Sequence, residues 1–200
     1  MSEEKIESDY IVNVDGIKLF RMIYHSTSGA TKAIVFLCHG LFEHCQSCYY
    51  ESIIKHLNAI DCMVVTHDHM VYATLKRPTF FKGMCLEAPF LIFPTNVSNV
   101  ALYMGKIVSV LLPKMPLGSI DYNDISRDVE YLEHVRKDKL RIHSRIPAKT
   151  VIEMHNAVEN LKGQMENVTT PFIIGHGEAD KLSEVEGSKL LVKKSPITDK

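Results

Sequence analysis

The sequence predicts an α/β protein built on a mostly parallel sheet, and three neighbouring stretches support this. The run Ala33–Cys38 is continuously apolar and ends at His39-Gly40, which is typical of a strand buried on both faces of a sheet. Apolar residues at helical spacing follow over residues 49–58. A second apolar run, Cys62–Val65, comes directly after them. Strand, helix and strand joined by short links form a βαβ unit, from which doubly wound α/β folds are built.

The remaining elements surround this unit. The stretch "YIVNVDGIKLF" predicts a hairpin with its turn at Asp15-Gly16. Apolar runs predict further strands over residues 83–87 and Phe172–Gly175, and a final helix opens in "LSEVEGSKLL", where Ser183 and Glu186 have the spacing of a capping box. Helical patterns fill most of the chain between those strands. We therefore expect one domain over residues 1–200, with a core of about 10–89 and 170–200 and a helical insert of about 90–169.

Composition narrows the class of protein. Hydrophobic residues make up 46% and charged residues 24% of the 200 residues, as in ordinary globular proteins. The net charge of −1 argues against a nucleic-acid partner. The polar start "MSEEKIESDY" does not resemble a signal peptide, and five cysteines are an odd number, so we expect free thiols and a cytoplasmic location.

Metal and cofactor sites are not expected. Cys45 and Cys48 form one C-x-x-C beside His44, but a zinc site needs about four ligands and no second cluster exists in the sequence. The side chains of "HDH", residues 67–69, would point in opposite directions on an extended chain, so they predict a polar strand end. The sequence contains no phosphate-binding P-loop and no G-x-G-x-x-G motif.

Two positions are candidate functional residues. Backbone N–H groups after His39-Gly40 are placed to bind an oxyanion, although an ordinary turn is the alternative. Asp180 follows the strand Phe172–Gly175, where α/β enzymes place functional groups, and turn chemistry is again the alternative.

One motif is missing, and one junction is abrupt. No two of the ten glycines lie four positions apart, so the sequence contains no G-x-S-x-G nucleophile elbow. The loop "HDH" runs directly into "MVYATLKRP", which looks like the last two turns of a helix stopped by Pro78. A helix this short is marginal on its own, because helix nucleation is costly.

Together these stretches resemble the monoacylglycerol lipases, serine hydrolases of the S33-like group in the α/β-hydrolase superfamily. The matching stretches include "HGLFEHCQSCYYESIIKHL", "VVTHDHM", "KRPTFFKGMCLEAP", "LLPKMPLGSIDYNDISRD" and "TTPFIIGHGEADKLSEVEGSKLL". The resemblance implies that Leu41, after His39-Gly40, supplies one N–H of the oxyanion hole and that Asp180 is the acid of a Ser–Asp–His triad. It also implies that the insert is a cap over an acyl-chain channel.

The same resemblance implies an incomplete enzyme. In family members the "HDH" loop leads through a helix and a central strand to the elbow, whereas this sequence passes from Met70-Val71 to the end of the elbow helix. The implied fold therefore lacks the central nucleophile strand, the serine and its oxyanion donor, and the final strand with the catalytic histidine. Ser47, Ser183 and His176 are not placed by the family pattern to replace them.

Three hypotheses of function follow. The chain is a truncated, inactive relative of enzymes that hydrolyse monoacylglycerol; or it is a non-catalytic lipid-binding or regulatory module; or it folds poorly because strand edges are exposed. The helix over residues 100–112 bears on the second hypothesis, because its broad apolar face either packs on a core or lies in a membrane interface. We expect this face to give a peripheral membrane contact, and it consists of Val100, Tyr103, Met104, Ile107, Val108, Leu111 and Leu112.

Overall fold

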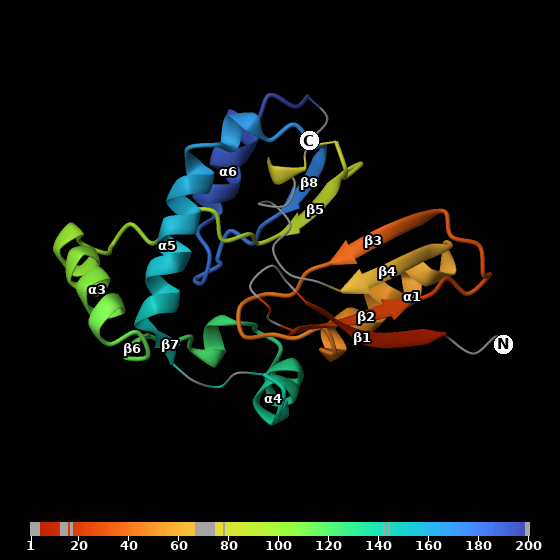
Figure 1. Cartoon of the computed structure of the whole chain (residues 1–200), viewed down its shortest axis with the longest axis horizontal. Coiled ribbons are helices and arrows are strands. Elements are labelled where there is room, and N and C mark those ends of the chain that lie inside the picture. Colours follow the sequence, from red (N-terminus) through yellow and green to blue (C-terminus); the bar gives the residue numbers. More distant parts are fainter. Residues whose placement is uncertain are drawn as a thin grey trace. The chain divides into compact units, whose positions relative to one another are not determined.

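The computed structural model describes residues 5–12, 16, 18–66, 75–77, 79–141, 143 and 145–198. The chain divides into two compact units (Figure 1): unit 1 contains residues 1–69 and 139–142, and unit 2 contains residues 70–138 and 143–200. The "HDH" residues and Met70-Val71 lie outside the described residues, as does Pro78, while Leu75 and Lys76 have helical backbone.

Unit 1 contains a four-stranded sheet in the order β1-β2-β4-β3. Its strands are β1 (Ile6–Val12), β2 (Lys18–Tyr24), β3 (Ala33–Leu37) and β4 (Cys62–Thr66). The first two strands pair antiparallel along their whole length, as the hairpin pattern predicts. β3 and β4 pair parallel from Ala33↔Cys62 to Leu37↔Thr66, which confirms the predicted βαβ unit.

The helix of this unit covers the predicted stretch. It begins as a short 3₁₀ turn, η1 (Cys48–Tyr50), and continues as α1 (Glu51–Ala59). Ser47 starts it, because its hydroxyl accepts a hydrogen bond from the Tyr49 N–H. The buried side chains Tyr50 and Ile54 pack with Val64 of β4, so the apolar face of the helix covers the sheet.

The prediction that Ala33–Cys38 is buried on both faces is wrong. β3 is the outer strand of its sheet, and Ile34 is 55% exposed. A strand with the composition of a central strand therefore stands at an edge.

Unit 2 is organised around a second parallel pair. β5 (Met84–Glu87) pairs with β8 (Phe172–Gly175) in register from Met84↔Phe172 to Glu87↔Gly175, and the bounds of β8 are those predicted. Helices α5 (Ala148–Lys162) and α6 (Val185–Lys194) and the 3₁₀ turn η3 (Met165–Asn167) supply the rest of its core. That core consists of Met84, Leu86, Leu91, Leu161, Met165, Val168, Phe172 and Leu191.

The insert between β5 and β8 is mostly helical. It contains α3 (Asn99–Leu111), the 3₁₀ turn η2 (Tyr122–Asp124), α4 (Val129–Lys137) and α5, and the short strands β6 (Pro116–Gly118) and β7 (Ile146–Pro147) pair antiparallel within it. α3 lies against α5 (Figure 1), and its buried residues are the small Gly105 and Ser109. A Cβ added at Gly105 would lie 3.2 Å from Ile152 Cδ1, so the absence of a side chain permits the close approach. Among the described residues, no helix is long and apolar enough to cross a membrane.

The predicted capping box of the last helix is wrong. Glu184 is the N-cap residue of α6 and makes no side-chain cap hydrogen bond. The Ser183 hydroxyl lies instead 2.8 Å from Asp180 Oδ2 and 3.1 Å from the Ala88 carbonyl oxygen. The hydroxyl therefore contacts a carboxylate of its own loop and a distant carbonyl oxygen instead of capping the helix.

Candidate functional site

Asp180 lies in the loop between β8 and α6, and that loop encloses its carboxylate. Oδ1 accepts the N–H groups of Leu182 at 2.8 Å and Ser183 at 3.0 Å. Oδ2 accepts the Ser183 hydroxyl at 2.8 Å and lies 3.5 Å from His176 Nε2. Both oxygens therefore have donors from the same loop or the strand end before it.

These contacts favour the ionised carboxylate. Burial by itself would raise the pKa of Asp180, but the hydrogen bonds from the backbone and side chain of Ser183 and from the Leu182 N–H outweigh it. The nearby His176 ring acts in the same direction, so the pKa of Asp180 lies below its ordinary value of 3.8. The candidate triad acid is thus a stable anion at neutral pH.

His176 does not act as a base toward Ser183 in this arrangement. Its Nε2 lies 2.9 Å from the Ser183 carbonyl oxygen, so Nε2 carries the hydrogen and donates it. Ser183 Oγ, 3.4 Å from the same nitrogen, faces no lone pair there. The other ring nitrogen, Nδ1, lies 2.6 Å from Ser188 Oγ.

Neither serine is presented to a substrate. Ser183 is 6% exposed and Ser188, within α6, is 4% exposed. No sequence pattern singles out Ser188, because only the tertiary structure brings it to His176, twelve positions earlier. Ser47 is also a structural residue, since its hydroxyl caps η1 and the residue is 9% exposed.

The loop after β3 carries the predicted oxyanion donor. Leu41 is 38% exposed, and no hydrogen-bond partner for its N–H is found within the described part of the chain. The Gly40 N–H is occupied, because it donates to Glu43 Oε2 at 3.1 Å. The role of the Leu41 N–H in an oxyanion hole stays a prediction.

A buried ion pair that the sequence did not reveal holds this loop. Glu43 Oε1 accepts a hydrogen bond from Arg141 Nη1 at 3.0 Å, and Oε2 accepts the Tyr50 hydroxyl at 3.0 Å as well as the Gly40 N–H. The two charged side chains are only 16% and 9% exposed. Phe42, which directly precedes Glu43 in the sequence, has a φ of +67°, a conformation that costs a residue other than glycine about 1–3 kcal/mol. The Glu43 contacts hold the loop in that shape.

The apolar face of α3 is uncovered. Its packing contacts with α5 are made on the side of Gly105 and Ser109, so the larger side chains point away. The alternative that this face packs under the cap is therefore wrong. We call the exposed set the α3 apolar face, and it consists of Val100 (73% exposed), Tyr103 (66%), Met104 (52%), Ile107 (38%), Val110 (76%), Leu111 (71%) and Leu112 (58%).

The described residues contain no group of three or more His, Cys, Asp or Glu side chains that could hold a metal ion. Cys45 is buried and Cys48 is exposed, and all five cysteines are free thiols.

Comparisons with known proteins point to one group. A family model described as serine aminopeptidase, S33, matches residues 69–200. Monoglyceride lipase of Rattus norvegicus is 27% identical, with 96% of this chain and 79% of that protein covered. A monoglyceride lipase homolog of Monkeypox virus is 20% identical, with 78% of this chain and 74% of that protein covered. The rat alignment extends over 242 positions although this chain has 200 residues, so part of the matched rat protein has no counterpart here.

Solved structures of monoacylglycerol lipases have a fold similar to that of this chain. Monoacylglycerol lipase of Paleococcus ferrophilus superposes with a TM-score of 0.78 at 19% identity, covering 92% of this chain and 86% of that one. A soluble variant of the Saccharomyces cerevisiae monoglyceride lipase gives 0.76 at 15% identity, covering 100% and 86%. The predicted α/β-hydrolase fold is thereby confirmed.

The lowered pKa of Asp180 makes a prediction about pH. A group with a lowered pKa in the folded state contributes stability above its unfolded-state pKa, and this contribution is lost as pH falls through the folded-state value. We expect Asp180→Asn to lower the free energy of unfolding at pH 7, with a penalty that shrinks as pH falls below the unfolded-state pKa and through the lowered folded-state pKa. Urea unfolding followed by circular dichroism measures it, with the exposed Glu166→Gln as control. A penalty that stays constant with pH would assign the loss to packing instead.

The Glu43–Arg141 pair makes a second prediction. Arg141→Met leaves a shielded carboxylate without its cation, which should cost about 3–5 kcal/mol of unfolding free energy. Adding Glu43→Gln should restore part of that loss. The matched control is Lys137→Met, which breaks an exposed pair with Glu133 and should cost no more than about 1 kcal/mol. Equal losses for Arg141→Met and Lys137→Met would show that the buried pair does not hold the loop.

Proposed function

Because the chain belongs to the serine aminopeptidase S33 family and has the fold of the monoacylglycerol lipases, we propose that it contacts lipid without hydrolysing it. The α3 apolar face is the observation that carries this proposal. The proposed ligand class is monoacylglycerol or a similar lipid, since the relatives are named for that substrate and the yeast structure holds a substrate analog.

The lipid contact is supported by the size and position of the exposed face. Six apolar side chains of α3 and the C-cap residue Leu112 are open to solvent, and exposed apolar patches mark sites of protein or membrane interaction. A helix with such a face can lie in a membrane interface, with its apolar side chains in the acyl region. The net charge of −1 gives no general attraction to anionic lipid, so we expect binding to neutral bilayers.

The absence of hydrolysis is supported by the residues around Asp180. Its carboxylate accepts hydrogen bonds from its own loop, and the nearby Ser183 and Ser188 are buried. The sequence has no G-x-S-x-G motif. We attribute the missing motif to the loss of a segment beside β3, because this strand has the composition of a central strand but lies at the edge of its sheet. The same loss explains why part of the matched rat protein has no counterpart in this chain. Removal of triad members leaves at best residual catalysis.

We place the protein in the cytoplasm and on membranes peripherally. Five free thiols suit a reducing compartment. The regulatory form of the proposal, in which the chain holds lipid without turning it over, requires that the protein accumulates in a folded state.

Cosedimentation tests the proposal. The purified protein should sediment with phosphatidylcholine vesicles that contain mono-oleoylglycerol, and the lipid recovered afterwards should be unhydrolysed. Replacing Leu111 and Leu112 by Asp should weaken binding at least about tenfold, because burial of each leucine is worth about 1.5–3 kcal/mol. The control is Ile60→Asp, a similarly exposed apolar residue (61%) in unit 1, which should bind like the wild type.

Two results would contradict the proposal separately. Equal sedimentation with and without vesicles, or full binding by the Leu111/Leu112 variant, would remove the lipid contact. Release of oleate at a rate above that of the Asp180→Asn variant would show that the chain is an active hydrolase. Protein recovered only as aggregate would favour the hypothesis of a poorly folding chain.

A further inference from the structure

Strand β1 forms an open edge of the sheet in unit 1 (Figure 1). In the strand order β1-β2-β4-β3 it is an outermost strand, and β2 pairs with one of its two sides. The pairing is regular from Ile6↔Tyr24 to Val12↔Lys18, and the seven residues of the strand include no proline. Natural proteins often protect an exposed edge with a proline, a bulge or a very short strand. β1 has none of these features, so its edge can accept another strand.

The hydrogen bonds of the sheet show which residues face this edge. In an antiparallel pair, successive residues direct their N–H and C=O groups alternately toward the partner strand and away from it. Lys5 directs its carbonyl oxygen toward β2, because that oxygen accepts the His25 N–H at 3.1 Å. The odd-numbered residues of β1 therefore bond to β2, and the even-numbered residues direct their backbone groups outward. The outward set consists of Ile6, Ser8, Tyr10 and Val12.

The same alternation is visible on β2. Met22 pairs with Ser8, and its N–H points away from β1, since it donates to Thr66 Oγ1 of β4 at 3.3 Å. Within the part of the chain that the structure describes, the outward backbone groups of β1 have no hydrogen-bond partner. The edge therefore presents a row of N–H and C=O groups that a further strand would satisfy.

The side chains of the outward set add an apolar surface. Strand residues two apart share a face of the sheet, so these side chains lie together. Ile6 is 47% exposed, Tyr10 63% and Val12 62%. The Tyr10 ring meets Phe20 of β2 edge-on, with ring centroids 5.4 Å apart. The central aromatic side chain of the edge is thus already positioned by its neighbour on β2.

The charges of β1 have partners within unit 1. Asp9 accepts a hydrogen bond from Arg21 Nε at 2.8 Å, and Glu7 lies 2.8 Å from Lys5 Nζ. Both carboxylates belong to odd-numbered residues, so they lie on the face opposite Tyr10. A strand that pairs with this edge therefore needs to supply no balancing charge, and β1 of a second copy is such a strand.

We propose that two copies of this chain associate through β1, with the two strands antiparallel across a two-fold axis. The assembly is closed, because both copies contribute the same edge. A register with Tyr10 opposite Tyr10 of the second copy pairs the outward residues and places Asp9 opposite Ile11. A register centred on Asp9 would instead set two carboxylates directly opposite each other, which is destabilising. Tyr10 is therefore the centre of the contact.

The dimer should be weak and depend on concentration. A contact limited to one strand edge is small beside the roughly 800 Å² that each partner buries in a standard interface. The contact uses no residue of the α3 apolar face, so it is independent of the proposed lipid contact.

Sedimentation equilibrium of the full chain without lipid, over a range of concentrations, tests the proposal. The wild type should pass reversibly from monomer to dimer. Tyr10→Lys and Tyr10→Glu should each weaken the dimer about tenfold, because each loses the aromatic pair and sets like charges opposite one another. An equimolar mixture of the two variants should recover the dimer, since opposite charges then meet at the axis. Only a contact of Tyr10 with its own copy gives this recovery.

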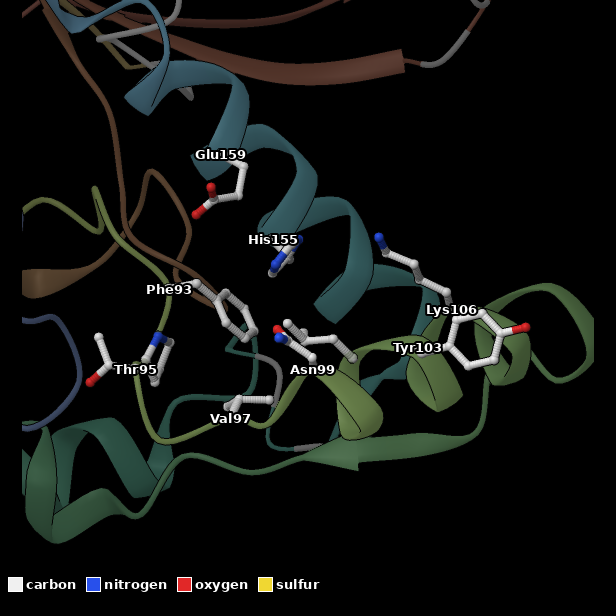
Figure 2. Close-up of a pocket in the computed structure, with 10 residues that line it drawn as sticks. Phe93, Thr95, Val97, Asn99, Tyr103, Lys106, His155 and Glu159 are labelled. Carbon is white, nitrogen blue, oxygen red and sulfur yellow. The ribbon is translucent and has the colours of Figure 1, made fainter.

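Unit 2 supplies the matched control. Tyr103 of α3 has nearly the same exposure, 66%, and Figure 2 shows it at the hollow that residues 93–99, α3 and α5 line. Tyr103→Lys and Tyr103→Glu should dimerise like the wild type, both alone and mixed. A further variant, Ser8→Pro, removes an outward N–H but no hydrogen bond to β2, so it should weaken the dimer while circular dichroism of the dilute protein stays unchanged.

The outcomes separate this inference from the proposed function. Tyr10→Lys should still sediment with phosphatidylcholine vesicles, because the lipid contact is assigned to α3. A wild type that stays monomeric at all concentrations, a dimer insensitive to charge at Tyr10, or a mixture that does not recover would overturn the inference. Equal weakening by the Tyr103 variants would also overturn it, since the contact would then lie on α3.

Discussion

The parallel pairing of β5 with β8 is the contact on which the rest of unit 2 depends. It joins residues 84–87 to residues 172–175, and the Ala88 N–H extends the ladder by donating to the Gly175 carbonyl oxygen at 2.8 Å. Both the helical insert, which leaves β5, and the Asp180 loop, which leaves β8, start from this short pair. α6 packs so closely on the chain after β5 that a Cβ at Gly187 would lie 3.1 Å from Leu91 Cβ. The core behind the pair fixes α5 as well, because Leu161 belongs to it.

This pairing also explains how Asp180, the predicted triad acid, is held as a structural group. The Ala88 carbonyl oxygen lies 3.1 Å from Ser183 Oγ, which orients the same serine whose hydroxyl and N–H contact Asp180. His176, at the end of β8, is held between the Ser183 carbonyl oxygen and Ser188. The carboxylate therefore stabilises its own loop, whereas the exposed apolar side chains of unit 2 include those of the α3 apolar face, which belongs to the insert.

The spacing of apolar residues along the chain predicted individual helices and strands and the parallel pairing of neighbouring strands. The bounds of β8, the helix after Ser47 and the parallel pair β3–β4 all follow from the order of apolar residues. The sequence could not predict contacts between distant residues, because Glu43 and Arg141 are 98 positions apart and Ser183 and Ala88 are 95 apart. The apolar stripe of α3 was visible, but its exposure depends on Gly105 and Ser109 facing α5. The family resemblance, by contrast, was recognisable from short motifs spread along the chain and is confirmed by the family match and the structural neighbours.

The central claim is that the chain keeps the fold and the acid of its family without an activated serine. Intact-protein mass spectrometry after incubation with a fluorophosphonate tests it most directly, because such reagents label a serine only where a base activates it. The account predicts an unmodified mass under conditions that label an active monoacylglycerol lipase completely. One equivalent of adduct on a single serine, absent after denaturation and absent from Asp180→Asn, would contradict it.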